Sequence, residues 1–435
     1  MIAPRRRVLF VSHGHPSTSV GGAETYALEL HQTMRGASDG FEPILLAHAA
    51  SPGGQPRVAR VSDGDDPTQV LFLSDPSAYD RFAGRADDGG AIADAFEDVL
   101  RELQPDVVHF QHTLFLGYDL IGVVRRTLPD AAIVYTLHEY LPICHHEGQM
   151  VRTYDRTPCL RPGPQDCARC FPGISAGQFL LRRRHTQSQF AMVNRFIAPS
   201  HFLRDRYVDW GIDPARIIVE ENGRPSADRV ESSVPARSRH TLGFFGQLTP
   251  FKGADVLLRA MRLLTEQGSA ARLRIHGANL ERQRSAFRRE VRALLDNTST
   301  NTTLHGSYRR DELPRLMADV DWVVVPSIWW ENAPLVIQEA FQHGRPVICS
   351  DIGGMAEKVT DGVNGLHFGA GDPASLAVTI TRAIEAPALW DQLVAGIPRV
   401  HSMRDHVARL EALYRELIDA RRGELAGARC GERWR

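Results

Sequence analysis

Two series of short apolar runs, separated by stretches with helical periodicity, follow one another along this chain of 435 residues. Runs this short and this apolar predict strands of parallel sheets, which helices cover on both faces. The runs are Val8–Val11, Ile44–Ala47, Val107–Phe110, Ile133–Leu137, Phe196–Ala198 and Ile217–Val219 in the first series, and Thr241–Phe245, Leu273–His276, Thr303–Leu304, Trp322–Val325 and Val347–Cys349 in the second. Such alternation of strand and helix predicts two α/β domains, each a parallel sheet with helices on both faces.

The break between the two series predicts the domain boundaries, and the length suits two domains better than one. We expect a first domain over 1–220, with a cysteine-rich loop at 144–170, and a second domain over 221–400. A terminal helix would cover 401–420, and the polar residues 421–435 would form a loose tail. Further predicted elements are helices at Ala23–Met34, Ala254–Leu264, Arg310–Met317 and Val407–Ile418, and loops with short hairpins over 51–94.

Composition excludes several classes of protein. The chain is 43% hydrophobic and 24% charged, as in ordinary globular proteins, and its formal net charge is −1. That charge provides no global field toward nucleic acid, so no nucleic-acid partner is expected. No apolar run approaches the ~20 residues that span a bilayer, which predicts a cytoplasmic protein. No Gly-x-Gly-x-x-Gly follows the first strand of either series, which argues against a nicotinamide or flavin enzyme.

An acidic pair stands between two predicted strands of the second series. Glu331 and Glu339 are eight residues apart, and Pro334 between them suits the first turn of a helix. The amides that would be free to face an anion at this helix start belong to Ala333, Leu335 and Val336. One carboxylate would lie in the loop and the other inside the helix, a layout that matches a sugar–diphosphate–ribose ligand. The alternative is a capped surface helix with two solvated glutamates.

The same segment resembles the Glu-x7-Glu motif of the retaining glycosyltransferases of family 4, and other motifs follow in that family's order. They are Gly21-Gly22-Ala23-Glu24, Gly246-Gln247-Leu248-Thr249-Pro250-Phe251-Lys252-Gly253, His305-Gly306, Pro326-Ser327, Gly344-Arg345-Pro346-Val347 and Gly353-Gly354-Met355-Ala356-Glu357. The resemblance is dense from Thr241 to about Phe368 and sparser from Val8 to Ala198. It implies the GT-B fold, in which two Rossmann-like domains face a central cleft.

The resemblance also implies an activity and a set of residues. The protein would transfer a sugar from a nucleotide-sugar donor to the hydroxyl of a glycan, a lipid-linked or a small-molecule acceptor, with retention of configuration and no cofactor required for catalysis. Glu331 would contact the donor sugar, Glu339 the ribose, and Lys252 the diphosphate. The catalytic candidates are Glu331, His138 and Lys252, and the donor-binding candidates are Gly21, Gly22, Gly246, Gln247, Lys252, Asn332, Ala333, Pro334, Leu335 and Glu339.

One position departs from the family pattern, which usually has an arginine where this chain has Gln247. Glutamine donates hydrogen bonds but brings no charge to a departing diphosphate. Arg224 and Arg309 are the candidate substitutes. His138, at the end of a predicted strand, would hydrogen-bond a sugar hydroxyl or share the acceptor proton, and the alternative is a histidine that only caps the strand.

The first domain contains four closely spaced cysteines, Cys144, Cys159, Cys167 and Cys170, the last two in a Cys-x-x-Cys pair. The loop between them has little apolar material, and a structural Zn²⁺ ion would organise it, with His145 and His146 as alternative ligands. Two other interpretations stay open, namely ordinary reduced cysteines and an iron–sulfur cluster or redox pair. Disulfides do not suit a reducing cytoplasm.

Further alternatives concern location, metal and function. Residues 178–195 predict a basic amphipathic helix, which either packs on the sheet or contacts the inner face of an anionic membrane that carries a lipid-linked acceptor. Asp319-Val320-Asp321 precedes a strand and is interpreted as a helix end rather than a metal site. A sugar-nucleotide epimerase, a phosphorylase or a non-catalytic sugar-nucleotide-binding protein would use the same fold.

Overall fold

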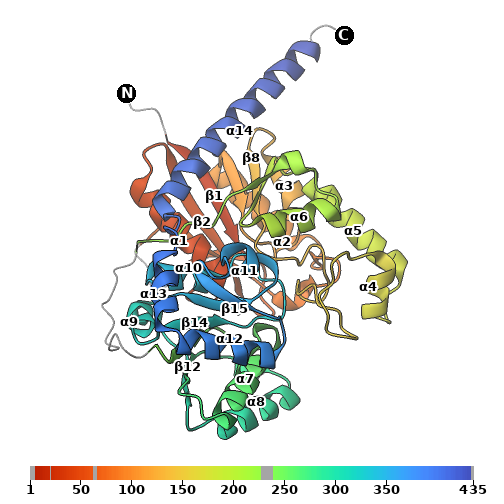
Figure 1. Ribbon diagram of the computed structural model, residues 1–435. Coiled ribbons are helices and arrows are strands. Elements are labelled where there is room, and N and C mark those ends of the chain that lie inside the picture. Colours follow the sequence, from red (N-terminus) through yellow and green to blue (C-terminus); the bar gives the residue numbers. More distant parts are fainter. Residues whose placement is uncertain (1–4, 20, 62–65, 227–238, 433–435) are drawn as a thin grey trace. The chain divides into compact units, whose positions relative to one another are not determined.

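The computed structural model describes residues 5–19, 21–61, 66–226 and 239–432. The chain divides into two compact units, one made of residues 1–225 with 401–435 and the other of residues 226–400. Each unit is built on its own sheet with helices beside it, as the alternation in the sequence predicts (Figure 1). The segment that begins at His401 belongs to the first unit, although the whole second unit precedes it in the sequence.

The sheet of the first unit has eight strands in the order β10-β9-β8-β7-β1-β2-β4-β3. Neighbouring strands are parallel, except that β3 is antiparallel to β4. The strands are β1 (Arg6–Ser12), β2 (Phe41–Ala50), β3 (Arg57–Arg60), β4 (Gln69–Ser74), β7 (Val107–Phe110), β8 (Ala132–Thr136), β9 (Arg195–Ala198) and β10 (Ile217–Val219), and β5 (Tyr79–Asp80) with β6 (Arg85–Ala86) forms a separate hairpin.

Residues 51–94 differ in part from their prediction as loops and hairpins. β4 pairs with β2 in parallel and so extends the main sheet, although only Phe72 and Ser74 of its six residues are buried. A half-exposed strand of this length has a weak apolar pattern, and its pairing with β2 is a tertiary contact that periodicity does not report.

The described residues of the first unit form seven α-helices, and α1 and α14 share one core with the sheet. They are α1 (Gly22–Ala37), α2 (Ala91–Leu103), α3 (Asp119–Thr127), α4 (Pro164–Cys170), α5 (Ala176–Phe190), α6 (His201–Trp210) and α14 (Met403–Glu432). The buried core joins Tyr26 and Leu30 of α1 to Val407 and Tyr414 of α14. α14, drawn in blue in Figure 1, therefore completes the first unit.

α14 continues to Glu432, where the sequence predicted a loose tail from residue 421. The added segment is rich in Ala, Arg and Glu, which are strong helix formers, and these propensities outweigh its three glycines. The last three residues of the predicted tail, 433–435, lie outside the described residues.

The sheet of the second unit has six parallel strands in the order β13-β12-β11-β14-β15-β16. They are β11 (Thr241–Phe245), β12 (Arg272–His276), β13 (Thr302–Gly306), β14 (Trp322–Val325), β15 (Val347–Ser350) and β16 (Gly365–Phe368). The helices are α7 (Ala254–Glu266), α8 (Ser285–Asn297), α9 (Leu313–Ala318), α10 (Leu335–Gln342), α11 (Gly353–Lys358), α12 (Pro373–Glu385) and α13 (Pro387–Ala395). β16 was not predicted, because it is short and opens with a glycine. A Cβ atom on Gly365 would lie 2.2 Å from Val347 O of the neighbouring strand.

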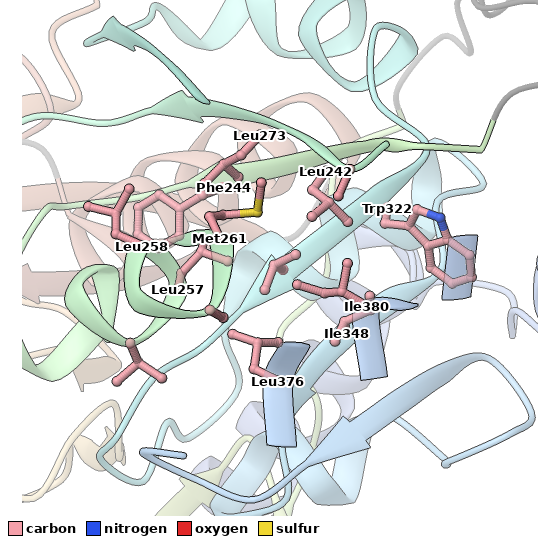
Figure 2. Packing of buried hydrophobic residues seen from close by; sticks show 14 of the residues in the cluster. Leu242, Phe244, Leu257, Leu258, Met261, Leu273, Trp322, Ile348, Leu376 and Ile380 are labelled. Atoms are coloured by element: carbon pink, nitrogen blue, oxygen red, sulfur yellow. The ribbon is translucent and has the colours of Figure 1, made fainter. Parts of the chain in front are cut away.

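One core cluster of the second unit lies between the sheet and α7 and α12 (Figure 2), and another joins the sheet to α9, α10 and α11. Leu257, Leu258 and Met261 on α7 are buried, and so are Leu376 and Ile380 on α12. Spacings of three and four residues place such side chains on one face of a helix, which faces the strands. This packing fixes the start of α7, directly after the segment that contains Lys252.

Asp319-Val320-Asp321 is a helix end, as the sequence predicted. α9 stops at Ala318 with Asp319 as its C-cap. Asp321 is buried and accepts the Thr241 backbone N–H at 2.9 Å, while Arg239 Nη1 lies 3.5 Å from its other oxygen. The Asp321 side chain therefore joins the start of β11 to the segment that precedes β14.

Candidate active site

Glu331 lies in the loop between β14 and α10 and is 5% exposed. Its Oε1 atom accepts hydrogen bonds from Lys252 Nζ at 2.5 Å, Ser327 Oγ at 2.7 Å and Trp329 Nε1 at 3.0 Å. Three donors on one oxygen, one of them charged, hold the carboxylate in a single orientation. The direction of the second oxygen, Oε2, is thereby fixed as well.

Lys252 ends the short 3₁₀ turn Pro250–Lys252, and Gly253 caps that turn with φ of +67°. A Cβ atom on Gly253 would lie 1.8 Å from Pro326 O, so only glycine lets this turn approach the loop after β14. The Ile328 N–H also donates to Phe251 O at 2.9 Å. These backbone contacts bring Lys252 to Glu331, and they place its Nζ 5.6 Å from the centre of the Trp329 ring.

α10 begins at Leu335, and Pro334 is its N-cap rather than a residue of its first turn. The prediction for Pro334 was wrong by one position, because its ψ of 117° is extended and not helical. The first backbone hydrogen bond of the helix runs from Ile337 N–H to Pro334 O at 3.0 Å. The amides of Leu335 and Val336 precede that bond, and they stand at the positive end of the helix dipole.

The loop between Glu331 and α10 packs against the start of α11. Gly354 N–H donates to Glu331 O at 2.7 Å, and a Cβ atom on Gly354 would lie 1.9 Å from Asn332 O. Asn332 is 7% exposed and Ala333 is partly buried. The predicted Gly353-Gly354 motif thus permits a close approach that shapes the loop.

Glu339 lies in the middle of α10 and is 9% exposed. Arg310 Nη2 is 3.9 Å from its Oε1 atom, and burial together with the charge of Glu339 raises the pKa of Tyr308. Arg310 is therefore a cation near the second glutamate. Arg309, a predicted substitute for the charge that Gln247 lacks, is exposed and pairs with Asp311. The other predicted substitute, Arg224, is buried in the first unit and pairs with Glu29 at 3.0 Å.

Gly246 and Gln247 follow β11 on the loop that leads to Lys252. Gly246 N–H donates to His276 O at 3.0 Å, and a Cβ atom on Gly277 would lie 2.2 Å from Gly246 O. Gln247 is exposed, so its amide faces solvent. The second unit thus holds most of the predicted donor-binding residues on two loops, which follow β11 and β14, and on α10.

In the first unit, Gly21 is the N-cap of α1, and Gly22 is its first residue. A Cβ atom on Gly21 would lie 2.4 Å from Glu24 Oε2, so the glycine makes room for the carboxylate of its own helix. Glu24 Oε1 accepts a hydrogen bond from Ser19 Oγ at 3.2 Å and lies 3.3 Å from His13 Nε2. Burial opposes ionisation, but the hydrogen bond and charge of His13 outweigh it and hold the pKa of Glu24 at about 2.

His138 follows β8 and lies with its ring edge toward Tyr26, 5.1 Å between centres. Its Nε2 atom is 2.9 Å from Gln111 Oε1. Burial, reinforced by His112 and His13, lowers the pKa of His138 to about 3, so the ring is neutral at physiological pH. With Nε2–H donating to Gln111, the ring orientation of His138 is fixed at the end of β8.

Two more histidines lie near His138, and sequence reasoning did not single them out. The His13 and His112 rings are 4.1 Å apart, and His112 Nε2 is 3.3 Å from Glu139 Oε1. His13, His112 and His138 each follow one of three adjacent strands, β1, β7 and β8. Carboxyl ends of parallel strands meet at one edge of a sheet, so a histidine after each predicted strand was the signal that would have revealed the group.

The four cysteines of residues 144–170 are free thiols that line a single cavity. Burial together with the neighbouring thiols raises the pKa of Cys144 to about 11 and that of Cys167 to about 12. Within the described residues, their sulfur atoms do not form a group in which all lie within 4.8 Å of one another. The thiols therefore share a cavity without yet having the spacing of metal ligands.

A different group among the described residues meets that spacing, namely Glu220, His401 and His406. Glu220 Oε1 lies 2.9 Å from His401 Nε2 and 3.2 Å from His406 Nδ1, and Arg409 Nη1 donates to its other oxygen at 2.9 Å. These are hydrogen-bond distances, and the guanidinium supplies the positive charge that a metal ion would bring. The group fastens the start of α14 to the end of β10.

Helix α5 covers most of the predicted basic segment 178–195. Two of its three consecutive arginines donate hydrogen bonds to backbone oxygens of the first unit. Arg182 donates to Phe82 O and Pro142 O, and Arg183 donates to Trp210 O. Leu181 is 69% exposed, and Arg184 is exposed as well. In the described part of the chain, no helix is both long and apolar enough to cross a bilayer.

Comparisons with known proteins cover nearly the whole chain. The sequence profile described as "Glycosyltransferase Family 4" matches residues 20–225, and the profile described as "Glycosyl transferases group 1" matches residues 239–386. A D-inositol 3-phosphate glycosyltransferase from a Nocardioides species is 26% identical over 91% of this chain and 86% of that protein.

Solved structures agree with the sequence profiles. Sucrose-phosphate synthase from Thermosynechococcus elongatus superposes with a TM-score of 0.73 at 19% identity, over 96% of this chain and 100% of that one. Anabaena HepE in complex with UDP and glucose gives a TM-score of 0.64 at 18% identity, over 94% of this chain and 100% of that one. These likenesses show the GT-B fold. The chain belongs to the family 4, group 1 glycosyltransferases, and it is an enzyme that transfers a sugar from a nucleotide-sugar donor.

Proposed function

We propose that the protein transfers a sugar with retention of configuration from a nucleoside diphosphate sugar, and that its second unit binds the donor. The observation that carries this proposal is the contact of Lys252 with the buried Glu331, four residues ahead of α10. Negative charge grows on the diphosphate as the sugar departs. Lys252 and the amides of Leu335 and Val336 supply positive potential for that charge without a metal ion.

The two glutamates would divide the rest of the donor between them. Oε1 of Glu331 is held by three donors, so Oε2 would accept from a hydroxyl of the donor sugar. Glu339 lies roughly 6 Å further along the axis of α10 than Leu335, a distance that suits the ribose beyond the diphosphate. Its contact with the half-exposed Arg310 is long, at 3.9 Å, and such a pair yields readily to a ligand.

The acceptor would bind at the edge of the first unit where the histidines gather. A neutral imidazole such as that of His138 is a ring that exchanges hydrogen bonds with hydroxyl groups without bringing a charge. A glycan, a lipid-linked sugar or a small polyol would offer such a hydroxyl. The inositol phosphate named for one relative supports the last of these three.

A panel of radiolabelled nucleotide sugars tests the activity. Transfer to an added acceptor, or slow hydrolysis without one, supports the proposal, and proton NMR of the product shows whether the donor configuration is retained. Epimerisation of the donor without transfer would contradict the proposal, and so would binding without turnover. Transfer with inversion would contradict retention alone.

We further propose that the protein acts as a soluble enzyme and that any membrane contact is peripheral, through Leu180 and Leu181 of α5. Both side chains are exposed, next to the exposed Arg184. Co-sedimentation with vesicles that contain anionic lipid tests this contact. Loss of binding in Leu181→Ser, but not in Val378→Ser, would support it, because Val378 is equally exposed in the second unit. Equal binding by both variants would contradict it.

A further inference from the structure

The cavity lined by Cys144, Cys159, Cys167 and Cys170 has no part in the proposed transfer chemistry. We propose that these four cysteines bind one structural Zn²⁺ ion, which holds the loop of residues 144–170 in its fold. The proposal goes beyond the transfer reaction and does not depend on it.

Three separate segments bring the thiols to the cavity. Cys144 closes a turn, with its N–H donating to Tyr140 O at 2.7 Å. Cys159 follows a short bridge, and its N–H donates to Met150 O at 2.7 Å. Cys167 and Cys170 lie three residues apart on α4, which places both on one face of the helix. The fold of the loop thus brings to one cavity four thiols that are up to 26 positions apart in sequence.

The chemistry of the cavity fits zinc. Four thiolates complete a tetrahedral Zn²⁺ site and leave no position for water, as in structural zinc sites. Of the two neighbouring histidines, His146 has its Nδ1 atom 2.8 Å from Val151 O, whereas the buried Nδ1 of His145 has no hydrogen-bond partner among the described residues. The four cysteines alone complete the ligand set, and the variants below separate them from His145.

Nearby cations balance the charge of such a site. A zinc ion with four thiolates has a net charge of −2. Arg152 acts electrostatically on Cys159, and Arg182, which is anchored on the backbone oxygen of Pro142, acts in the same way on Cys144 and Cys167. Hydrogen bonds and positive charge around the sulfurs are the usual surroundings of a thiolate metal site.

The loop has little else to hold it together. All of residues 144–170 are described, and only Met150 and Val151 among them are buried hydrophobic residues. The backbone is also strained, because Glu147, Met150 and Arg156 have φ of 49°, 47° and 60°. Such conformations persist where surrounding contacts enforce them. An ion that joins all three segments would provide that constraint.

Zinc binding requires the thiols to move. Zn–S bonds of ~2.3 Å in a tetrahedron place the sulfur atoms ~3.8 Å apart, closer than in the arrangement described above. We therefore expect the loop to be ordered with zinc and looser without it, whereas the core around Leu242 and Met261 should not respond.

Metal analysis of the full chain, purified by gel filtration without chelator, is the direct test. The expected result is one zinc per chain in the native protein and loss of that zinc in Cys167→Ser and Cys170→Ser. Cys349→Ala is the matched control, because Cys349 is buried in β15 of the second unit, outside the loop. Absence of stoichiometric zinc, or zinc content unchanged in Cys167→Ser, would overturn the proposal. Iron and sulfide in place of zinc would overturn it too.

Two further measurements do not require the variants to fold. Replacement of the metal by Co²⁺ should give the absorption of tetrahedral cobalt with sulfur-to-metal charge transfer, and its absence would contradict thiolate ligation. Chelation should increase hydrogen exchange in residues 144–170 while binding of UDP stays within twofold. An unchanged exchange rate in the loop would contradict the structural role, whatever the outcome for transfer activity.

Discussion

Lys252 Nζ lies 2.5 Å from Glu331 Oε1, so two residues for which we propose contacts with different parts of the donor form one ion pair. The Glu331 side chain is 7% exposed and that of Lys252 is 34% exposed. A pair this buried interacts more strongly than a surface pair, because little water screens it. Each side chain therefore positions the other, and removal of either one affects both.

Replacement of Glu331 tests its place at the sugar. Glu331→Ala should reduce kcat by about 30- to 1000-fold, which corresponds to the ~2–4 kcal/mol of a lost transition-state contact. Affinity for free nucleoside diphosphate should fall much less. Steady-state kinetics and calorimetry measure the two effects. Near-normal transfer by a folded Glu331→Ala variant would rule out this role.

The ion pair itself is tested by a double-mutant cycle. Lys252→Ala and Glu331→Ala should each slow transfer, and the double variant should lose less than the sum of the two losses, with a coupling of about 1–3 kcal/mol. As a control, Arg259→Ala with Glu290→Ala removes an exposed pair of the same unit, whose coupling in the same assay should be close to zero. Additive effects of Lys252 and Glu331 would show that the two side chains act independently.

Glu339→Ala should weaken binding of the free diphosphate as well as of the donor. A carboxylate that accepts from ribose hydroxyls contributes roughly 1.5–3 kcal/mol. Calorimetry with UDP, GDP and ADP measures this loss and also reports the preferred base. Glu266→Ala, at the exposed end of α7, serves as the matched control. Equal affinities for Glu339→Ala and the native protein would reject ribose contact.

Gln247→Arg should fold normally, because Gln247 is exposed on the loop after β11. The new guanidinium restores a positive charge beside the loop of Lys252 and should increase affinity for the diphosphate several-fold. Thermal unfolding checks the fold and calorimetry checks the affinity. A decrease in affinity would show that the loop does not face the phosphates.

The Glu24 carboxylate should make stability depend on pH in the acid range. Its folded pKa of about 2 lies below the ordinary value of 4.5. The contribution is therefore fully present above pH 4.5 and is lost as the pH falls toward 2, where the unfolded chain binds the additional proton. Glu24→Gln should cost on the order of 2–3 kcal/mol at pH 7 and little near pH 2. Urea unfolding across this range measures the difference, and a cost that is independent of pH would contradict the assignment.

Local sequence determined the elements that carry the site. The apolar runs at Val107–Phe110, Thr241–Phe245 and Trp322–Val325 coincide with β7, β11 and β14, because a strand buried on both faces needs continuous apolar residues. The same local signals placed Glu331 in a loop and Glu339 inside a helix. They also showed four cysteines close together within residues 144–170, two of which lie on α4. All of these features depend on residues that are near one another in the chain.

Tertiary structure decided which of these residues meet. The contact between Lys252 and Glu331 depends on β11 and β14 being neighbours in the sheet, although they are 80 positions apart in sequence. The contact of Arg310 with Glu339, and the gathering of His13 near His138, depend in the same way on strand order and on side-chain direction. Periodicity and propensity report only the local backbone, whereas these contacts come from the pairing of distant strands and the packing around them.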